Sequence, residues 1–239
     1  MPIRPASVRI TRASGDARMR IMTIASQKGG TGKSTLAINL GVLAGKSHAP
    51  VVLVDCDAHR GLAQWRLVRA AERPVVAELP ASGSLEEVLA GCRAAKAGLV
   101  VLDTPAGTPA PGSLIARAIA AADLVVMPSK AGFLDIMAAR PTVEAIRRAK
   151  RPGVIVLNEV PPRGSVVEGA RTALIGYGLP VCPKAIAHRV AVSYSLLQGQ
   201  SLAEYEADNR GAAEFAAVWS WIKEHLGHGA QPRQAARAS

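Results

Sequence analysis

The chain has 239 residues, 49% of them hydrophobic, so it is long enough to bury one continuous core and is expected to form one α/β domain. Its 29 lysines and arginines outnumber 18 acidic residues, a formal charge of +11. This charge favours an acidic partner such as nucleic acid or a membrane surface, although a solvated basic surface gives the same excess. The three cysteines are isolated, which argues against a disulfide framework and a zinc site. Only 3% of the residues are aromatic, which argues against stacking of nucleic-acid bases on aromatic side chains.

The beginning of the chain contains a basic segment, a short apolar run and a glycine-rich loop. Residues 1–18 lack periodicity and are expected to form a flexible arm, with Met19 as an alternative start. Ile21 to Ala25 is predicted to be a buried strand, and a helix is predicted from Lys33 to Ala44. Between them lies Lys-Gly-Gly-Thr-Gly-Lys-Ser-Thr, residues 28–35. This strand, loop and helix order is the context that a phosphate-binding loop requires.

The loop predicts a site for ATP and Mg²⁺. Its glycines allow backbone N–H groups to approach phosphate oxygens, and the helix N-terminus favours an anion. Lys33 is expected along the β- and γ-phosphates, and the Ser34 hydroxyl is expected to coordinate magnesium. The predicted nucleotide-binding residues of the loop are Lys28, Gly29, Gly30, Thr31, Gly32, Lys33, Ser34 and Thr35.

Further apolar runs, separated by lengths suited to crossover helices, predict a parallel sheet covered on both faces. The strong predicted strands are Val51–Asp55, Leu99–Asp103, Leu124–Pro128 and Val154–Asn158, and the weaker ones are Pro74–Leu79, at an edge, and Leu179–Cys182. The predicted fold is therefore α/β, with a doubly wound, mostly parallel sheet flanked by helices. Residues 19–226 are assigned to this single domain, and residues 227–239 to a disordered tail.

Polar residues end several of the predicted strands. Asp55, Asp103 and Asn158 should converge, because ligands of open parallel sheets bind beyond the carboxyl ends of the strands. Each alone is also explained as a helix cap or turn residue. Asp55 and Asp57 would repel one another without a nearby cation, and magnesium is the expected one.

The loop departs from the general pattern G-x-x-x-x-G-K-[ST], because Gln27 stands where glycine is expected and Lys28 follows it. In this respect the chain resembles the ParA/MinD class of deviant Walker A ATPases. The resemblance extends over residues 19–226, through Ala-Asp-Leu-Val-Val-Met-Pro at 122–128, Leu-Asp-Ile at 134–136 and Val-Leu-Asn at 156–158. Tyr-Gly-Leu-Pro at 177–180 and Glu-Tyr-Glu at 204–206 look most like small plasmid-partition ParA (ParF-like) proteins without an N-terminal helix-turn-helix domain.

The resemblance implies roles for individual residues. Lys28 would reach a dimer partner's nucleotide, Asp57 would help to place the attacking water, and Asn158 would read the adenine edge. The implied catalytic residues are Lys28, Lys33 and Asp57, and the implied metal site consists of Ser34, Asp55 and Asp103. Two segments depart from the family: Ala58-His59-Arg60-Gly61 stands where Pro-Gln-Gly is usual, and Ser129-Lys130-Ala131 adds a cation.

The implied function is that of a partition or positioning ATPase. It would form a homodimer with ATP, bind nucleoid DNA non-specifically, and leave the DNA after a small centromere-binding or cargo-adaptor protein stimulates hydrolysis. The cargo would be a plasmid, a chromosome region or a protein assembly, and the location the cytoplasm and nucleoid. The candidate DNA-binding residues are Arg140, Arg147, Arg148, Lys150 and Arg151, with Arg163, Arg171, Lys184 and Arg189 less well placed.

Two alternatives remain open at this point. A MinD-like membrane ATPase would need an amphipathic helix at the C-terminal end. A stripe at helical spacing near that end is expected to pack in the core instead, and stable membrane association is not expected; its residues are Phe215, Trp219, Ile222 and Leu226. A metabolic enzyme on the same fold is the second alternative, because a fold does not fix a function.

Overall fold

The structure is a computed structural model that describes residues 18–46, 50–162 and 165–227, so the predicted arm and tail lie almost wholly outside the described residues. The strands are β1 (Arg20–Ile24), β2 (Val51–Asp55), β3 (Val75–Glu78), β4 (Leu99–Asp103), β5 (Leu124–Ser129) and β6 (Gly153–Leu157). The helices are α1 (Lys33–Gly45), α2 (Gly61–Val68), α3 (Leu85–Ala94), α4 (Leu114–Ala121), α5 (Phe133–Arg148), α6 (Val166–Ile175), α7 (Val190–Leu197), α8 (Leu202–Tyr205) and α9 (Arg210–Gly227).

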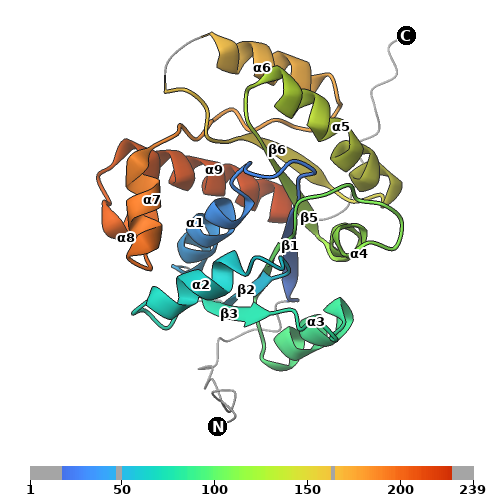
Figure 1. Cartoon of the computed structure of the whole chain (residues 1–239), viewed down its shortest axis with the longest axis vertical. Coiled ribbons are helices and arrows are strands. Elements are labelled where there is room, and N and C mark those ends of the chain that lie inside the picture. The colour runs from blue at the N-terminus through green and yellow to red at the C-terminus, as the bar shows by residue number, and fades with distance from the viewer. Residues whose placement is uncertain (1–17, 47–49, 163–164, 228–239) are drawn as a thin grey trace.

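The six strands form one parallel sheet in the order β3-β2-β4-β1-β5-β6. Helices cover both faces: α1, α2 and α9 pack on one, and α3, α4 and α5 on the other (Figure 1). Strands buried on both faces need apolar residues at every position, which explains why their sequences show little alternation. The predicted doubly wound α/β fold is confirmed.

The two weaker strand predictions have different outcomes. The run Pro74–Leu79 contains β3, which is an edge strand as expected. The run Leu179–Cys182 was wrongly predicted as a strand, because it makes only an isolated parallel bridge between Val181 and Ile155. Pro180 carries no N–H group, so the ladder cannot extend toward Leu179, and in the other direction Leu157 O accepts from Ile186 N instead of continuing the ladder.

The apolar stripe of α9 lies in the core, as predicted. Phe215 and Ile222 are fully buried, and Trp219 and Leu226 nearly so, against α1 and the sheet. The face that a membrane-binding helix would need is therefore already used in packing. None of the described helices is long and apolar enough to cross a membrane.

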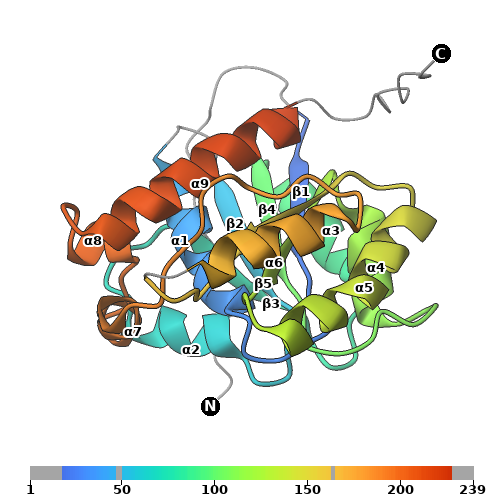
Figure 2. The same ribbon diagram turned by 90° about the horizontal axis from the view of Figure 1, so that it is seen from above.

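The parallel topology gathers the chemically important loops at one edge of the sheet. Asp55 and Asp103 are direct neighbours in the register of β2 and β4, and Ile24 pairs with Asp103 on the other side. The loops after β1, β2 and β4 therefore leave the sheet side by side. Figure 2 shows this edge with α2, α7 and the beginning of α5 around it.

Candidate nucleotide site

The glycine-rich loop joins β1 to α1 and takes a shape that other residues would not allow. Gly30 and Gly32 have φ angles of 69° and 82°, in the left-handed region. A Cβ on Gly32 would also lie 2.3 Å from Asn158 Nδ2. Gly32 precedes α1 without a side-chain cap, and no acidic residue stands in the first turn of the helix. The first N–H groups of α1 are thus suited to an anion.

Lys33, the first residue of α1, is a buried cation. Its side chain is 7% exposed, and burial lowers its pKa, although the carboxylates of Asp103 and Asp57 oppose that change. A buried ammonium group is costly unless a negative charge lies close to it. The phosphates of a nucleotide would supply that charge at the beginning of the helix.

Asp103, at the end of β4, is a buried carboxyl group without a hydrogen-bond partner at either oxygen. It is 1% exposed, and burial raises its pKa to about 7. The Ser34 hydroxyl lies near enough to oppose this change, although it forms no hydrogen bond of normal geometry, and the charge of Asp55 adds to the increase. Such a group is stabilised by a bound cation. Asp103 and Ser34 therefore fit Mg²⁺, which would offset charge on the phosphates.

The candidate ligands Asp103 and Ser34 offer carboxylate and hydroxyl oxygens, which are the kind of ligand that magnesium prefers. No cluster of three or more His, Cys, Asp or Glu side chains able to hold a metal occurs in the part of the chain that the structure describes. Mg²⁺ at phosphate sites needs few protein ligands, because phosphate oxygens and waters complete its octahedron.

Replacing Asp103 with asparagine is expected to stabilise the metal-free, nucleotide-free protein. A carboxyl group whose pKa is raised on folding binds its proton more tightly in the folded state, so stability falls as the pH rises from about 4 to about 7. Asp103→Asn removes that loss, so the free energy of unfolding is expected to increase by roughly 2–4 kcal/mol at pH 8 and by less at pH 5. Urea denaturation at both pH values measures it, and an unchanged free energy of unfolding at pH 8 would contradict the argument. With Mg-ATP present, the variant should gain less from the ligand than the unmodified chain.

Asp55 holds the loop after β2 through both carboxylate oxygens. Oδ1 accepts a hydrogen bond from Asp57 N at 3.1 Å, and Oδ2 accepts one from Ala63 N at 3.0 Å. Asp55 thus fixes both the loop and the beginning of α2. A direct metal contact would compete with these bonds, so its predicted place in the metal site stays a prediction.

Asp57 lies in the same loop and is only half-buried, with Oδ1 accepting from His59 N at 3.0 Å. The unusual sequence after it closes the loop without a proline: Arg60 adopts a left-handed conformation, with φ 53°, and pairs with Glu78 at 3.0 Å. A Cβ on Gly61 would lie 3.5 Å from Ser34 Oγ. The loop therefore returns to the side of the site where magnesium is expected.

Lys28 contacts the first turn of α5. Its Nζ lies 2.6 Å from Asp135 Oδ1; the lysine side chain is 41% exposed and the aspartate 12%. Asp135 belongs to the Leu-Asp-Ile sequence that the family resemblance includes, but sequence reasoning gave it no role. The lysine that the resemblance assigns to a partner's nucleotide is thus held by an aspartate of its own chain.

Gln27, the residue in place of the usual glycine, connects the phosphate loop to the loop after β4. Its carbonyl accepts from Gly107 N at 2.9 Å, and its side chain donates to Thr108 Oγ1 at 3.1 Å. Its own N–H donates to Thr142 Oγ1 at 3.2 Å. The sequence indicated a special role for Gln27 only through its departure from the glycine pattern. Its hydrogen-bond partners are about 80 or more residues away along the chain, so the sequence did not predict them.

Asn158 is buried against the phosphate loop, where its Nδ2 donates to Thr31 O at 2.8 Å. This bond uses one of the two Nδ2 hydrogens, so the other hydrogen and Oδ1 are left for an adenine edge, and base reading stays a prediction. The neighbouring Glu159 pairs with Lys130 at 2.6 Å. The extra cation in Ser129-Lys130-Ala131 therefore neutralises an acid beside the loop.

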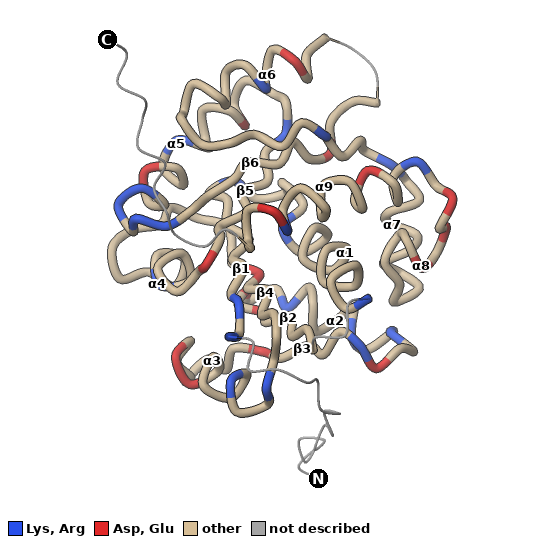
Figure 3. The backbone as a smooth tube through the Cα atoms, turned by 180° about the vertical axis from the view of Figure 1, so that it is seen from behind, with Lys and Arg blue, Asp and Glu red and all other residues tan. Residues whose placement is uncertain are grey.

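The predicted DNA-binding residues differ in whether their side chains already contact other groups of the protein. Arg140 pairs with Glu144 at 3.0 Å, and Arg147 and Arg148 donate to the carbonyls of Tyr177 and Pro109. Lys150 and Arg151 are exposed in the turn after α5. Figure 3 shows this basic stretch at the end of α5, between α5 and β6.

The less well placed basic residues are also mostly paired. Arg171 lies 3.3 Å from Glu168, and Arg189 lies 2.5 Å from Glu214. Lys184 is exposed, and Arg163 lies outside the described residues. The structure thus gives no single cluster that contains all the predicted cations.

The comparisons with known proteins agree with this geometry. The profile of the CobQ/CobB/MinD/ParA nucleotide binding domain matches residues 22–202. The chain is 32% identical over 206 residues to the maintenance of carboxysome distribution protein A of Gloeobacter kilaueensis, covering 82% of this chain and 89% of the relative. It is 28% identical over 188 residues to Protein ParA of Rhizobium radiobacter, covering 73% and 81%.

Solved structures share the fold. Apo McdA of Cyanothece matches with a TM-score of 0.68 at 21% identity, over 88% of this chain and 100% of that one. The septum site-determining protein MinD of Pyrococcus horikoshii, complexed with Mg-ADP, matches with a TM-score of 0.63 at 20% identity, over 90% and 100%. The family match covers the phosphate loop and every strand of the sheet from β2 to β6. The chain is therefore a member of the CobQ/CobB/MinD/ParA family of nucleotide-binding proteins, with relatives among the ParA and McdA proteins.

Proposed function

We propose that this chain is an ATP-dependent positioning ATPase. With ATP and Mg²⁺ bound, two copies associate, and the dimer binds nucleoid DNA without sequence preference. Hydrolysis, accelerated by a small centromere-binding or cargo-adaptor protein, releases the dimer from DNA. The cargo is a plasmid, a chromosome region or a protein assembly, and the chain works in the cytoplasm at the nucleoid.

The observation that carries this proposal is the position of Lys28. In an ATPase that works as a monomer, a lysine in the loop would contact the phosphates of its own chain. Here the Nζ of Lys28 lies 2.6 Å from Asp135 Oδ1, and 41% of the lysine side chain is exposed. An exposed cation at the rim of a phosphate site is available to a second copy of the same site. The buried Lys33 already occupies the position next to the chain's own phosphates.

The names of the relatives support a positioning role. Their names refer to the maintenance of carboxysome distribution and to ParA. A carboxysome is a protein assembly, so these names support the protein assembly among the three proposed cargoes. The +11 charge of the chain supports a polyanion as the surface on which it moves.

The test is binding to non-specific duplex DNA across a salt series, with ATP, with ADP, and for Lys33→Ala with ATP. We expect binding that requires ATP, weakens at least tenfold in the variant, and falls steeply with salt because phosphate contacts release counterions. Binding that is absent or equal with both nucleotides would remove DNA from the proposal and favour membranes or small-molecule substrates.

The two free cations after α5 provide a second arm of the same experiment. The double substitution Lys150→Gln and Arg151→Gln is expected to weaken DNA binding and to lower the salt slope by up to about four, because each of the two copies in the dimer loses two phosphate contacts. Arg140→Gln is the matched control, because its guanidinium pairs with Glu144. An unchanged slope in the double variant would move the DNA surface elsewhere on the molecule.

A further inference from the structure

A pocket of about 230 Å³ lies at the edge of the sheet opposite to the nucleotide site. Three residues that line it, Arg20, Val51 and Leu99, are the first residues of β1, β2 and β4. Leu99 is the register partner of both Arg20 and Val51, so the three strands begin side by side. A strand rises about 3.3 Å per residue, so the pocket is roughly 13 Å from the carboxyl end of β4 at Asp103. It is therefore a separate site from the phosphate loop.

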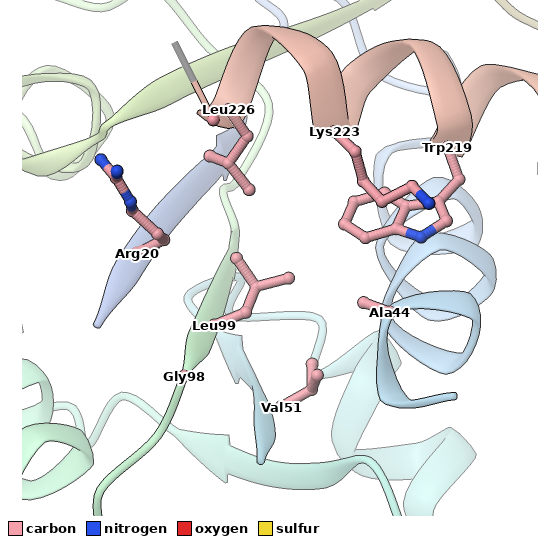
Figure 4. A pocket seen from close by; sticks show the side chains of 9 residues that line it. Arg20, Ala44, Val51, Gly98, Leu99, Trp219, Lys223 and Leu226 are labelled. Carbon is pink, nitrogen blue, oxygen red and sulfur yellow. The ribbon is translucent and has the colours of Figure 1, made fainter. Parts of the chain in front are cut away.

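The floor of the pocket is apolar. Its buried side chains are between 3% and 9% exposed and come from α1, β2, β4 and α9: Ala44, Val51, Leu99, Trp219 and Leu226. Figure 4 shows Trp219 and Leu226 on α9 facing the other three across the opening. The backbone at the floor is already hydrogen-bonded, because Gly98 N donates to Pro50 O at 2.8 Å and Gly98 O accepts from Arg20 N at 2.9 Å. The floor therefore suits an apolar group that needs no hydrogen bonds.

Two cations, Lys223 and Arg20, stand at the rim of this floor, on different sides of Leu226 (Figure 4). Lys223 is exposed and forms no ion pair with any residue that the structure describes. Arg20 lies 3.6 Å from Asp123, but Arg18 pairs with the same carboxylate at 3.1 Å, so two guanidinium groups share one negative charge. None of the described residues that line the pocket is acidic. The rim therefore carries a net positive charge.

We infer that this pocket binds a small amphipathic carboxylate, with its apolar chain on the floor and its carboxylate at the rim beside Lys223. Ligand pockets typically combine an apolar lining with a few charged groups that fix the orientation of the ligand. Lysine and arginine form charge-assisted hydrogen bonds with carboxylates, and Arg20 adds to the positive potential at the rim. The volume corresponds to roughly eight waters at about 30 Å³ each, so it suits an acid of about eight to ten non-hydrogen atoms.

Charge distinguishes this ligand from segments of the chain itself. Residues 1–17 contain three arginines and one aspartate, and residues 228–239 contain two arginines and no acidic residue. Either segment would bring further positive charge to a rim that is already positive, whereas a carboxylate neutralises it. The inference does not depend on the proposed function, because the pocket includes no residue of the phosphate loop.

Trp219 in the lining allows binding to be measured directly. The probe is hexanoate with a bromine at the end of its chain, because bromine quenches the fluorescence of a tryptophan that it contacts. We expect saturable quenching with a Kd below about 1 mM, and binding at least tenfold weaker for the uncharged bromohexanol of the same chain length. Trp219→Phe keeps an aromatic ring in the lining and should lose most of the quenching, since Trp65 and Trp221 lie outside the lining.

Substitutions of the two cations test the charge. Lys223→Gln is expected to weaken bromohexanoate binding about threefold to fivefold, as for a partly exposed ion pair. The double variant with Arg20→Gln should bind the acid no more tightly than the alcohol. Lys184→Gln is the matched control, because it removes an exposed lysine outside the pocket and should change nothing. Lys33→Ala should also bind the acid normally, so failure of the proposed ATPase function leaves this measurement intact.

Four results would overturn the inference. The first is the absence of saturable quenching, and the second is equal affinity for the acid and the alcohol. The third is quenching that persists in Trp219→Phe, because the acid would then bind elsewhere. The fourth is self-association of the unmodified chain that hexanoate reverses in sedimentation, because a second copy would then occupy the pocket. Binding of a fluorescent ATP analogue verifies that each cation variant folds, and the comparison of acid with alcohol on the unmodified chain decides the matter where one does not.

Discussion

Replacing Asp57 with asparagine is expected to slow ATP hydrolysis about a hundredfold or more, while ATP binding changes little. Asp57 stands in the loop after β2, half-buried, with one oxygen engaged by His59 N. A carboxylate there is able to orient or deprotonate an attacking water, and a positioned base contributes roughly 10²–10⁴-fold. The amide keeps the size and the contact to His59 N but loses the charge. Single-turnover phosphate release measures the effect, and a fluorescent ATP analogue measures binding.

Asp55→Ala is the control for a structural effect in the same loop. It leaves Asp57 N and Ala63 N without their acceptor, so the loop and the beginning of α2 lose two hydrogen bonds. That variant should lose thermal stability and nucleotide binding together, whereas Asp57→Asn should lose neither. If Asp57→Asn loses ATP affinity as strongly as it loses turnover, Asp57 supports the loop rather than the reaction.

The parts of the fold and site that sequence predicted are those with local causes. The buried strands β2 and β4 were predicted to the residue, because apolar runs of five residues ending in aspartate leave few alternatives. The phosphate loop was predictable for a similar reason, since glycines, lysine and serine occur together between a strand and a helix. The position of Asp103 followed from these two, because parallel strands bring their carboxyl ends to one edge.

The remaining features depend on which distant segments meet. The pairing of Lys28 with Asp135 requires β5 to lie beside β1, and nothing local specifies that order. The same holds for Arg147 and Arg148, whose guanidinium groups donate hydrogen bonds to backbone carbonyls of distant segments. A charge count along α5 could not distinguish them from the free Lys150.

Lys28→Ala is expected to abolish the ATP-dependent dimer and to slow partner-stimulated hydrolysis about a hundredfold or more. The reason is that a charged donor to the transferring phosphate contributes up to 10³-fold or beyond when it comes from a second molecule. ATP binding to the single copy should stay within about threefold, since Lys33 remains and each tenfold change in affinity would require a loss of about 1.4 kcal/mol. Sedimentation with a slowly hydrolysed ATP analogue measures the dimer, and phosphate release with and without the stimulating partner measures hydrolysis.

Asp135→Asn separates the ion pair from the role of the lysine. In the single copy the pair is a half-exposed salt bridge, worth about 0.2–1 kcal/mol, and it must open before Lys28 can reach a partner's phosphate. Two such pairs open when the dimer forms, one in each copy, so removing them should tighten the dimer by up to about thirtyfold. The double variant with Lys28→Ala should behave like Lys28→Ala alone, because Asp135 then has no lysine to hold. If Asp135→Asn instead weakens the dimer as much as Lys28→Ala does, both residues contribute to the dimer. The ion pair within one chain would then persist in the dimer and would not have to open before the dimer forms.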